Sequence, residues 1–473
     1  MGSTVFDRSH PNPALITASL ANSTLEPFWL DGLDVPVFDR LTSIESADLL
    51  VVGGGYTGLW TALLAKERDP SARVVVLEAR TLGWAASGRN GGFCEASLTH
   101  GASNGQRRWP QELDQLERLG LENLDEIEAT VTSQNWNVDF ERTGTLSVAT
   151  EEYQVAELRE AADDETELFF DGPAVRRLVD SPTYLAGLWS TRATAVIHPG
   201  KLVAELARAC VEAGVEIFEH SPVRGLDSVS TAGAVVAETL HGTINAKRIA
   251  LATNAFPSLL KRYALHTVPV YDYVLMTEPL SDVQLASIGW EKRQGIADLA
   301  NQFHYYRLTA DNRILWGGYD AIYHYGGRIK PEYDDRPQTF EKLAHHFFTT
   351  FPQLEGLGFS HRWAGVIDTS TRFCAFFGLA RQGRVAYAAG FTGLGVAATR
   401  FAANVMLDRL AGLETERTQL EMVRQVPPPF PPEPAAFLGV QATRAALNRA
   451  DHNDGKRNIL LKTLDAAGLG FDS

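Results

Sequence analysis

Residues 47–78 read ADLLVVGGGYTGLWTALLAKERDPSARVVVLE, and the pattern of this stretch predicts the type of fold. The apolar run from Leu49 to Val52 stops at three glycines, which is typical of a strand buried on both faces of a parallel sheet. Residues 59–65 follow with helical spacing, and residues 73–77 form a second β-branched run. A strand, a glycine turn, a helix and a strand within about thirty residues predict a βαβ unit.

Gly53, Gly55 and Gly58 form a GxGxxG pattern between the predicted strand and helix. The first glycine permits the tight turn, the second lets the backbone approach a pyrophosphate, and the third lets the helix pack on the strand. Glu78 ends the second strand, twenty residues after Gly58, where a carboxylate accepts hydrogen bonds from ribose hydroxyls. Such a pattern alone can be a flexible glycine turn. Its strand, helix and acidic residue together predict dinucleotide binding, with the diphosphate at the helix N-terminus.

A second loop, Ala86 to Gly92 (ASGRNGG), favours FAD over NAD as the bound dinucleotide. Its three glycines, Arg89 and Asn90 can wrap a second phosphate or a ribityl chain, although on its own it could be a surface loop. A glycine-rich turn at residues 390–395 precedes a long predicted helix far along the chain. The two segments together predict a cradle that holds both ends of FAD.

The order of the predicted elements indicates an α/β protein whose nucleotide domain is discontinuous. We expect a Rossmann-type FAD-binding domain with an inserted α+β substrate domain built on an antiparallel sheet. The predicted segments are an irregular lead-in over 1–46, the FAD-binding domain over 47–137, 196–266 and 357–425, the substrate domain over 138–195 and 267–356, and a linker with a helical tail over 426–473. Helices are expected over 111–130, 199–213, 338–350, 396–410 and 435–449, and strands over 138–142, 145–149, 215–218, 248–252, 268–277, 303–309, 313–319 and 384–389.

Composition excludes several functional classes. The formal charge is −15 and no block of Lys or Arg tracks phosphates, so nucleic acid is a disfavoured partner. Cys94, Cys210 and Cys374 are far apart, which predicts buried thiols in a reducing compartment and neither a disulfide nor a metal site. There is no secretion signal and no run of about eighteen apolar residues. We therefore expect a cytoplasmic protein without a membrane span; its oligomeric state is left open.

The sequence resembles the FAD-dependent amine and amino-acid oxidoreductases of the D-amino-acid oxidase superfamily, which includes glycine and sarcosine oxidases. The resemblance is greatest to the γ-glutamylputrescine oxidase-like branch. It spans most of residues 47–410 and excludes the lead-in and the residues after 425. The matching segments are ADLLVVGGGYTGLWTALLA, VVVLEARTLGWAASGRNGG, HPGKLVAELARACVEAGVEIFEHSPV, RIALATNAF and VAYAAGFTGLGVAATRFAANVML.

The resemblance implies a set of FAD contacts. The diphosphate would lie at Gly53, Gly55, Tyr56, Thr57 and Gly58, and the adenosine ribose at Glu78, Ala79 and Arg80. Ser87, Gly88, Arg89, Asn90, Gly91 and Gly92 would line the diphosphate, ribityl chain and isoalloxazine, Val223 would meet the adenine, and Thr253 and Asn254 would approach the diphosphate. Gly390, Phe391, Thr392, Gly393, Leu394 and Gly395 would lie against the pyrimidine end of the flavin, where helix N–H groups stabilise its negative charge.

Two positions depart from the sarcosine oxidase pattern. Gly365 stands where those enzymes attach the flavin through a cysteine, so we expect non-covalent FAD. Ala397 stands where they carry a lysine that binds the substrate carboxylate, which puts a substrate anchored in that way in doubt.

The expected reaction removes a hydride from the carbon next to an amine nitrogen, and flavin N5 accepts it. The aromatic residues of the predicted inserted sheet are the candidates for the substrate pocket. Along residues 303–308, His304 and Tyr306 share one face of the strand and Tyr305 and Arg307 the other. We expect His304 and Tyr306, with Tyr271, to be the catalytic residues, and Trp363 and Phe391 to be weaker candidates; packing in the core is the alternative for each.

Three functions are compatible with these features. The first is oxidation of the C–N bond of a small amine or amino acid to an imine, followed by hydrolysis, with oxygen or another acceptor reoxidising the flavin. The second is a flavin-dependent 2-hydroxy-acid dehydrogenase, which needs a cationic clamp that Arg307 could supply. The third is a non-catalytic flavin-binding subunit, which the complete fingerprint disfavours.

Overall fold

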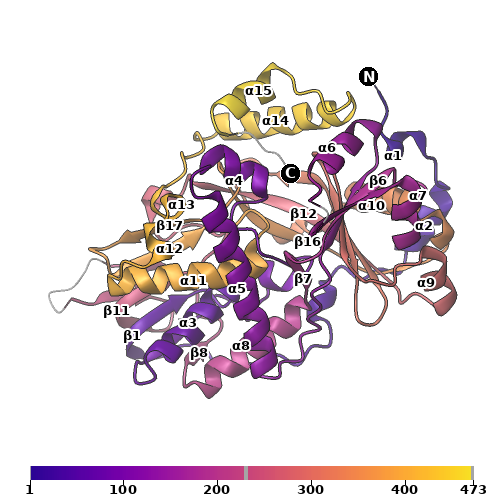
Figure 1. Cartoon of the computed structure of the whole chain (residues 1–473). Coiled ribbons are helices and arrows are strands. Elements are labelled where there is room, and N and C mark those ends of the chain that lie inside the picture. Colours follow the sequence, from indigo (N-terminus) through magenta and orange to yellow (C-terminus); the bar gives the residue numbers. More distant parts are fainter. Residues whose placement is uncertain (1, 164, 228–232, 470–473) are drawn as a thin grey trace.

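Two eight-stranded sheets organise the chain (Figure 1) in a computed structural model that describes residues 2–163, 165–227 and 233–469. The first sheet has the order β17–β18–β11–β1–β2–β8, parallel from β18 to β8, and β10 and β9 extend it beside β11. Its strands are β1 (Ile44–Val52), β2 (Val74–Leu77), β8 (Glu216–Phe218), β9 (Gly225–Leu226), β10 (Val235–Glu238), β11 (Thr243–Leu251), β17 (Phe376–Ala380) and β18 (Val385–Ala389). The predicted Rossmann-type sheet is thereby confirmed.

The apolar run of β1 is explained by two cores, one on each face of this sheet. Leu49 and Val51 pack among residues of the covering helices, whereas Leu50 and Val52 pack with the second apolar cluster around β10 and β11. Alternate side chains of a strand point to opposite faces, so a strand covered on both sides is apolar throughout. The helices of this domain are α3 (Tyr56–Arg68), α4 (Ala102–Arg108), α5 (Leu113–Ser133), α8 (Pro199–Glu212) and α11 (Gly395–Ala411).

The second sheet has the order β16–β12–β15–β14–β13–β4–β6–β5, and only the β13–β4 pair among its described neighbours is parallel. Helix α10 packs against β12 and β15. The strands are β4 (Thr145–Ala149), β5 (Glu167–Asp171), β6 (Ala186–Ser190), β12 (Thr267–Thr277), β13 (Gly295–Asp298), β14 (His304–Leu308), β15 (Ile314–Tyr323) and β16 (Phe359–Ser370). The helices are α6 (Val155–Glu160), α7 (Gly172–Leu178), α9 (Asp282–Ile288) and α10 (Pro337–Thr350).

Two expectations from sequence differ from this structure. Residues 359–370 were expected in the FAD-binding domain, but β16 pairs with β12 along its length and belongs to the second sheet. The expected strand over 138–142 is absent from this described stretch, because Asp139 adopts a left-handed φ of 50° and only Glu141 bridges to Val196. Val196 lies on β7 (Thr194–Val196), which pairs with β3 (Phe93–Glu95) in a separate small sheet.

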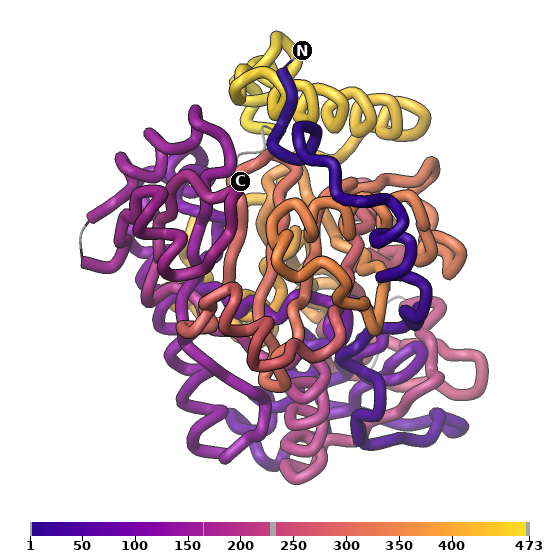
Figure 2. Tube along the Cα trace, turned by 90° about the vertical axis from the view of Figure 1, so that its right-hand side faces the viewer, coloured from indigo at the N-terminus to yellow at the C-terminus, as the bar shows by residue number. Residues whose placement is uncertain are grey.

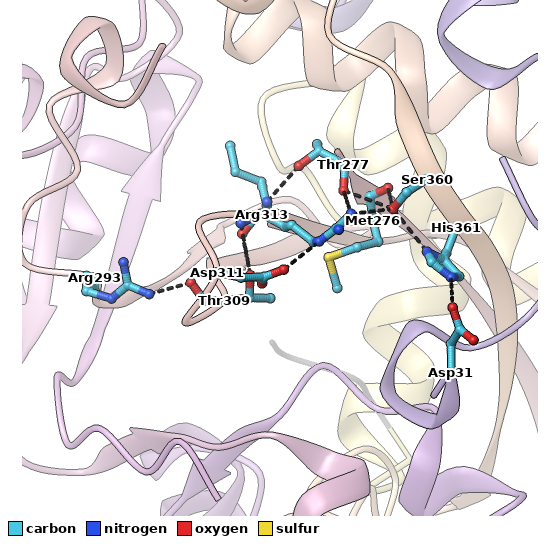
Figure 3. A network of polar contacts seen from close by, with 10 residues as sticks. Asp31, Met276, Thr277, Arg293, Thr309, Asp311, Arg313, Ser360 and His361 are labelled. Atoms are coloured by element: carbon cyan, nitrogen blue, oxygen red, sulfur yellow. Dashed lines mark hydrogen bonds and ion pairs between the residues drawn. The ribbon is translucent and has the colours of Figure 1, made fainter. Parts of the chain in front are cut away.

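The lead-in is more ordered than its prolines suggest. It forms α1 (Val5–Arg8) and α2 (Pro13–Leu20) and then joins the second sheet. Arg362 donates its backbone N–H to the Thr24 carbonyl at 2.9 Å, and His361 Nε2 lies 3.2 Å from the Asp31 carboxylate. Figure 3 shows this contact beside the polar network in which Arg313 joins the β14–β15 turn to β12 and β16.

The tail lies across one end of the molecule, beside the N-terminus (Figures 1 and 2). After α12 (Glu416–Gln419), α13 (Glu421–Arg424) and a proline-rich segment, the expected helix is present as α14 (Ala435–Asp451), and an unexpected α15 (Ile459–Ala466) follows. The Glu433 carboxylate accepts the Tyr323 hydroxyl at 2.6 Å, and Asp451 accepts the backbone N–H of Asn301 at 2.9 Å. None of the helices in the described residues has the length and apolar character needed to traverse a bilayer.

Candidate active site

A cavity of about 1850 Å³ is lined by both sheets and by the tail. It exceeds the ~300–1,000 Å³ of most ligand pockets, so it has room for an extended cofactor together with a substrate. The residues that line it include the three glycine-rich segments, the aromatic strands of the second sheet and α14. The three cysteines are buried and free, as expected, and none of them lines it.

The first glycine segment is shaped by close backbone contacts. A Cβ atom on Gly53, whose φ is +115°, would lie 2.3 Å from the Ala252 carbonyl oxygen, and one on Gly58 would lie 1.8 Å from the Gly53 carbonyl oxygen. Both positions therefore require glycine, which brings the start of α3 directly onto the end of β1. A Cβ on Gly55 would lie 2.8 Å from Ser87 Oγ, which itself accepts the backbone N–H of Tyr56 at 3.0 Å. The first and second loops are thus in direct contact.

Glu78 is buried at the end of β2 and organises the backbone beside it. Its carboxylate accepts the backbone N–H groups of Gly54 at 2.6 Å and Arg80 at 2.9 Å, and the indole N–H of Trp84 at 2.8 Å. These bonds hold the acid at the cavity wall, where sequence reasoning expects a ribose.

The second loop, residues 86–92, is fixed by hydrogen bonds within the loop and by hydrogen bonds from other parts of the chain. The Asn90 amide donates to the carbonyl of Ser87 and accepts the backbone N–H of Gly92. Two buried tryptophans hold its carbonyls: Trp29 donates to that of Asn90 at 2.8 Å, and Trp363 to that of Arg89 at 2.9 Å. Trp29 comes from the lead-in, and sequence analysis gave it no role. Trp363, a weaker substrate candidate, supports the loop instead.

The third segment, residues 390–395, is fixed by a carboxyl group from the second sheet. Asp368 on β16 accepts the backbone N–H of Gly390 at 2.6 Å and of Phe391 at 3.1 Å. Burial raises the pKa of Asp368 to about 7, although these amides oppose the shift. A Cβ on Gly393 would meet nothing within 4 Å, so open space borders this turn just before α11 begins.

Most of the predicted cofactor positions meet at this cavity. It is lined by Gly53, Gly55, Tyr56, Thr57, Glu78, Ala79, Ser87, Arg89, Asn90, Gly91, Val223, Thr253, Asn254, Phe391, Thr392, Gly393, Leu394 and Gly395. Gly58, Arg80, Gly88, Gly92 and Gly390 are not among the lining residues. Gly88 and Gly92 lie behind the wall, where a Cβ would be 2.4 Å from the Gly83 carbonyl and 2.3 Å from the Ile197 carbonyl. Glycine-bounded backbone at two helix starts, with an acid nearby, fits a dinucleotide such as FAD.

The structure places two of the three predicted catalytic residues away from the cavity. His304 is buried between Asp298, 2.6 Å from its Nδ1, and His346, 2.8 Å from its Nε2. Tyr306 is buried, and its hydroxyl lies 2.7 Å from that of Tyr184. These side chains belong to the core on the α10 side of the sheet, because β14 turns its other face to the cavity. No His, Cys, Asp or Glu group in the described residues is arranged to hold a metal ion.

Tyr305 lines the cavity in their place, together with Tyr271, the third predicted residue. The Tyr305 hydroxyl donates to the carboxyl group of Asp272 on β12, which also lines the cavity. Burial raises the pKa of Asp272 to about 6, against the opposing effect of the hydrogen bond from Tyr305. Asp272 was not predicted from the sequence, because only the aromatic residues of this strand, such as Tyr271 and Tyr273, were considered as candidates.

Arg307, the predicted clamp for a hydroxy acid, does not reach the cavity. It is buried, it donates to the carbonyls of Gly92 at 3.2 Å and Ile197 at 2.9 Å, and its guanidinium group lies 5.2 Å from the Trp29 ring. Ala397 is also buried and outside the cavity wall. Arg307 thus supports the second loop from behind.

Known proteins resemble this chain in sequence and in fold. Residues 48–409 match the family model described as DAO, FAD dependent oxidoreductase. Gamma-glutamylputrescine oxidoreductase of Escherichia coli (strain K12) is 33% identical over 393 residues, 79% of this chain and 86% of that protein. A probable oxidoreductase, OrdL, of Haemophilus influenzae is 28% identical over 403 residues, 82% of this chain and 88% of that protein. The crystal structure of glycine oxidase from Geobacillus kaustophilus has a similar fold, with a TM-score of 0.65 and 19% identity over 79% of this chain and 96% of that one.

Proposed function

Because this chain belongs to the family of FAD-dependent oxidoreductases, we propose that it oxidises a carbon–nitrogen bond of a small amine to an imine, which water then hydrolyses. FAD, when bound, supplies the hydride acceptor. The glycine segments at 53–58, 86–92 and 390–395 would hold it, with Glu78 at the ribose. These positions remain predictions that FAD retention by their variants would test.

The observation that carries the proposal is the Asp272–Tyr305 pair in the cavity wall. An amine reaches the cavity mostly as an ammonium ion, which has no lone pair to assist hydride loss. The Asp272 carboxylate attracts the ammonium group and accepts its proton, and its raised pKa of about 6 makes it a stronger base than an ordinary aspartate. Tyr305 fixes the orientation of the carboxylate. The name of the Escherichia coli relative, gamma-glutamylputrescine oxidoreductase, supports an amine-bearing substrate.

A 2-hydroxy acid is the weaker alternative, because it needs a cation for its carboxylate. Arg307 is turned into the core, and the buried residue at 397 is alanine. Arg89 also lines the cavity, but its guanidinium group is already paired with the Asp334 carboxylate at 2.9 Å.

Anaerobic bleaching of the bound flavin tests this proposal. Primary amines, N-methyl amines, polyamine conjugates, amino acids and 2-hydroxy acids are each mixed with the FAD-loaded enzyme, and the visible absorbance is followed. We expect amines to bleach it; admission of air then separates an oxidase from a dehydrogenase. Bleaching by hydroxy acids alone would overturn the proposed reaction while leaving the fold and cofactor intact.

A further inference from the structure

The cavity wall contains a second carboxyl group that the proposed reaction does not use. Glu95 lies on β3 and lines the cavity, yet within the described part of the chain no hydrogen bond or ion pair involves its side chain. Burial raises the pKa of Glu95. Glu95 is half-buried, and a carboxyl group that loses part of its water without gaining a partner is destabilised, which points to a partner that comes with a ligand.

Thr145 on β4 provides a second polar group without a partner beside it. Thr145 lines the same cavity, and its hydroxyl oxygen is buried and has no hydrogen-bond partner among the described residues. The two residues are joined through the backbone: Glu95 pairs with Thr194 in the β3–β7 sheet, and the Gly144 N–H donates to the Thr194 carbonyl at 3.0 Å. This connection, two strand spacings and one residue along β4, places their backbones within about 13 Å of each other.

The position of Glu95 relative to Asp272 and Tyr305 follows from the contacts of Phe93. The Phe93 ring packs edge-on against Tyr305 with centroids 5.8 Å apart, and Phe93 also lines the cavity. Glu95 is two residues further along the same strand, so it points to the same side and lies ~7 Å beyond Phe93. Asp272 lies on the other side of Tyr305, at its hydroxyl group. The two carboxyl groups therefore face one cavity from opposite sides of the Phe93–Tyr305 contact.

We propose that Glu95 and Thr145 form a second cation-binding subsite, which holds a positively charged nitrogen of the substrate while Asp272 receives the nitrogen that is oxidised. An ammonium group has three N–H donors and no acceptor, which matches a carboxylate and a hydroxyl oxygen. The inference rests on the proposed function and narrows its substrate class to amines with a second cationic nitrogen, such as diamines and longer polyamines. The subsite binds and positions; no bond is made or broken there.

Binding to the reduced enzyme tests the subsite separately from the chemistry, because photoreduced holoenzyme cannot oxidise an amine. Calorimetry under anaerobic conditions compares butylamine with 1,4-diaminobutane, and hexylamine with 1,6-diaminohexane. Hydrogen bonds to charged groups are strong enough that the diamine of one pair should bind about 10- to 100-fold more tightly than its monoamine. In Glu95→Gln this advantage should fall to less than about 3-fold, and in Thr145→Val, which keeps the branched shape of the strand residue, it should fall partly.

Glu157→Gln is the control, because Glu157 is exposed on α6 and its loss changes only the overall charge. Glu95→Asp should retain part of the preference, and it replaces Glu95→Gln if that variant does not fold. Equal affinities for diamine and monoamine in the wild-type enzyme, or an undiminished preference in Glu95→Gln, would overturn the subsite. Failure of the proposed function looks different: a diamine would then bind to reduced enzyme in a Glu95-dependent way, yet no amine would bleach the oxidised flavin.

Discussion

The hydroxyl group of Tyr305 on β14 reaches over the intervening strand β15 to donate a hydrogen bond to Asp272 on β12. Gly317, the β15 partner of Tyr305, leaves the necessary space, since a Cβ there would lie 2.5 Å from the Tyr305 Cζ atom. A Cβ on Gly91 of the second loop would lie 2.6 Å from the same ring. Glycines of the second loop and of β15 thus leave the space that the Tyr305 ring fills.

The variant Tyr305→Phe tests whether the Tyr305 hydroxyl contributes to the reaction, and Tyr306→Phe tests whether the neighbouring hydroxyl contributes only to packing. Removal of the hydroxyl that orients Asp272 should lower kcat/KM for amine about 10- to 100-fold, the range expected for a hydrogen bond to a charged group. Tyr306→Phe is the matched control, since it removes a hydroxyl that pairs with Tyr184 inside the core. That variant should lose about 1 kcal/mol of unfolding free energy and keep its kcat/KM. Equal losses of activity in the two variants would contradict our assignment of the faces of β14.

The rate of flavin reduction should rise with pH through about 6 because of Asp272. Burial raises the pKa of this carboxyl, so below that pH it is protonated and cannot accept the ammonium proton. Stopped-flow measurement of the second-order rate constant for flavin reduction by an amine, from about pH 5 to 8, should show this rise. The ionisation of the free amine affects the rate only at higher pH. Asp272→Asn should be slow and lack the rise; its persistence in that variant would assign it to another group.

Asp368 should make the enzyme less stable as the pH rises. Burial raises the pKa of Asp368 in the folded protein to about 7 from an ordinary value of 3.8. Its contribution to the unfolding free energy is therefore fully present below pH 3.8 and is lost as the pH rises through 7. The unfolding free energy from urea titrations should therefore fall less steeply across this window in Asp368→Asn than in the wild type. The asparagine keeps only one acceptor for the Gly390 and Phe391 amides, so retention of FAD should also weaken. Asp114→Asn, at an exposed site on α5, should leave both properties unchanged.

Release of the end of α14 should expose the cofactor to solvent. The Asp451 carboxylate accepts the Asn301 backbone and side-chain N–H groups at 2.9 and 2.6 Å, and Asp451→Ala removes both bonds. We expect iodide to quench the flavin fluorescence of this variant more strongly than that of the wild type. Arg449→Ala, at an exposed site two residues earlier, is the control. Indistinguishable quenching in the three proteins would show that the tail does not shield the flavin.

The glycine segments and both sheets were predictable because local chemistry specifies them. Gly53 and Gly58 must be glycine for steric reasons that any such turn shares, and the apolar runs of β1 and β2 require cover on both faces. The faces of β14 were not predictable, because His304, Tyr305 and Tyr306 all avoid bulk solvent and the pattern shows no polar side. The sheet to which β16 belongs depends on its pairing with β12, about ninety residues earlier, which no local signal encodes. Trp29 likewise gains its role only when a distant loop presents the Asn90 carbonyl.

The tail that lines the cavity with Val440, Thr443 and Leu447 is translated after all three glycine segments. The third glycine segment at 390–395 leaves the ribosome about forty residues before α14 does, so all three glycine segments exist while one wall of their cavity has not yet been made. FAD would then meet a cavity that still lacks the wall formed by α14. Loading with FAD should therefore be easier during synthesis than afterwards, and an enzyme stripped of its flavin should recover it more slowly than the nascent chain acquires it.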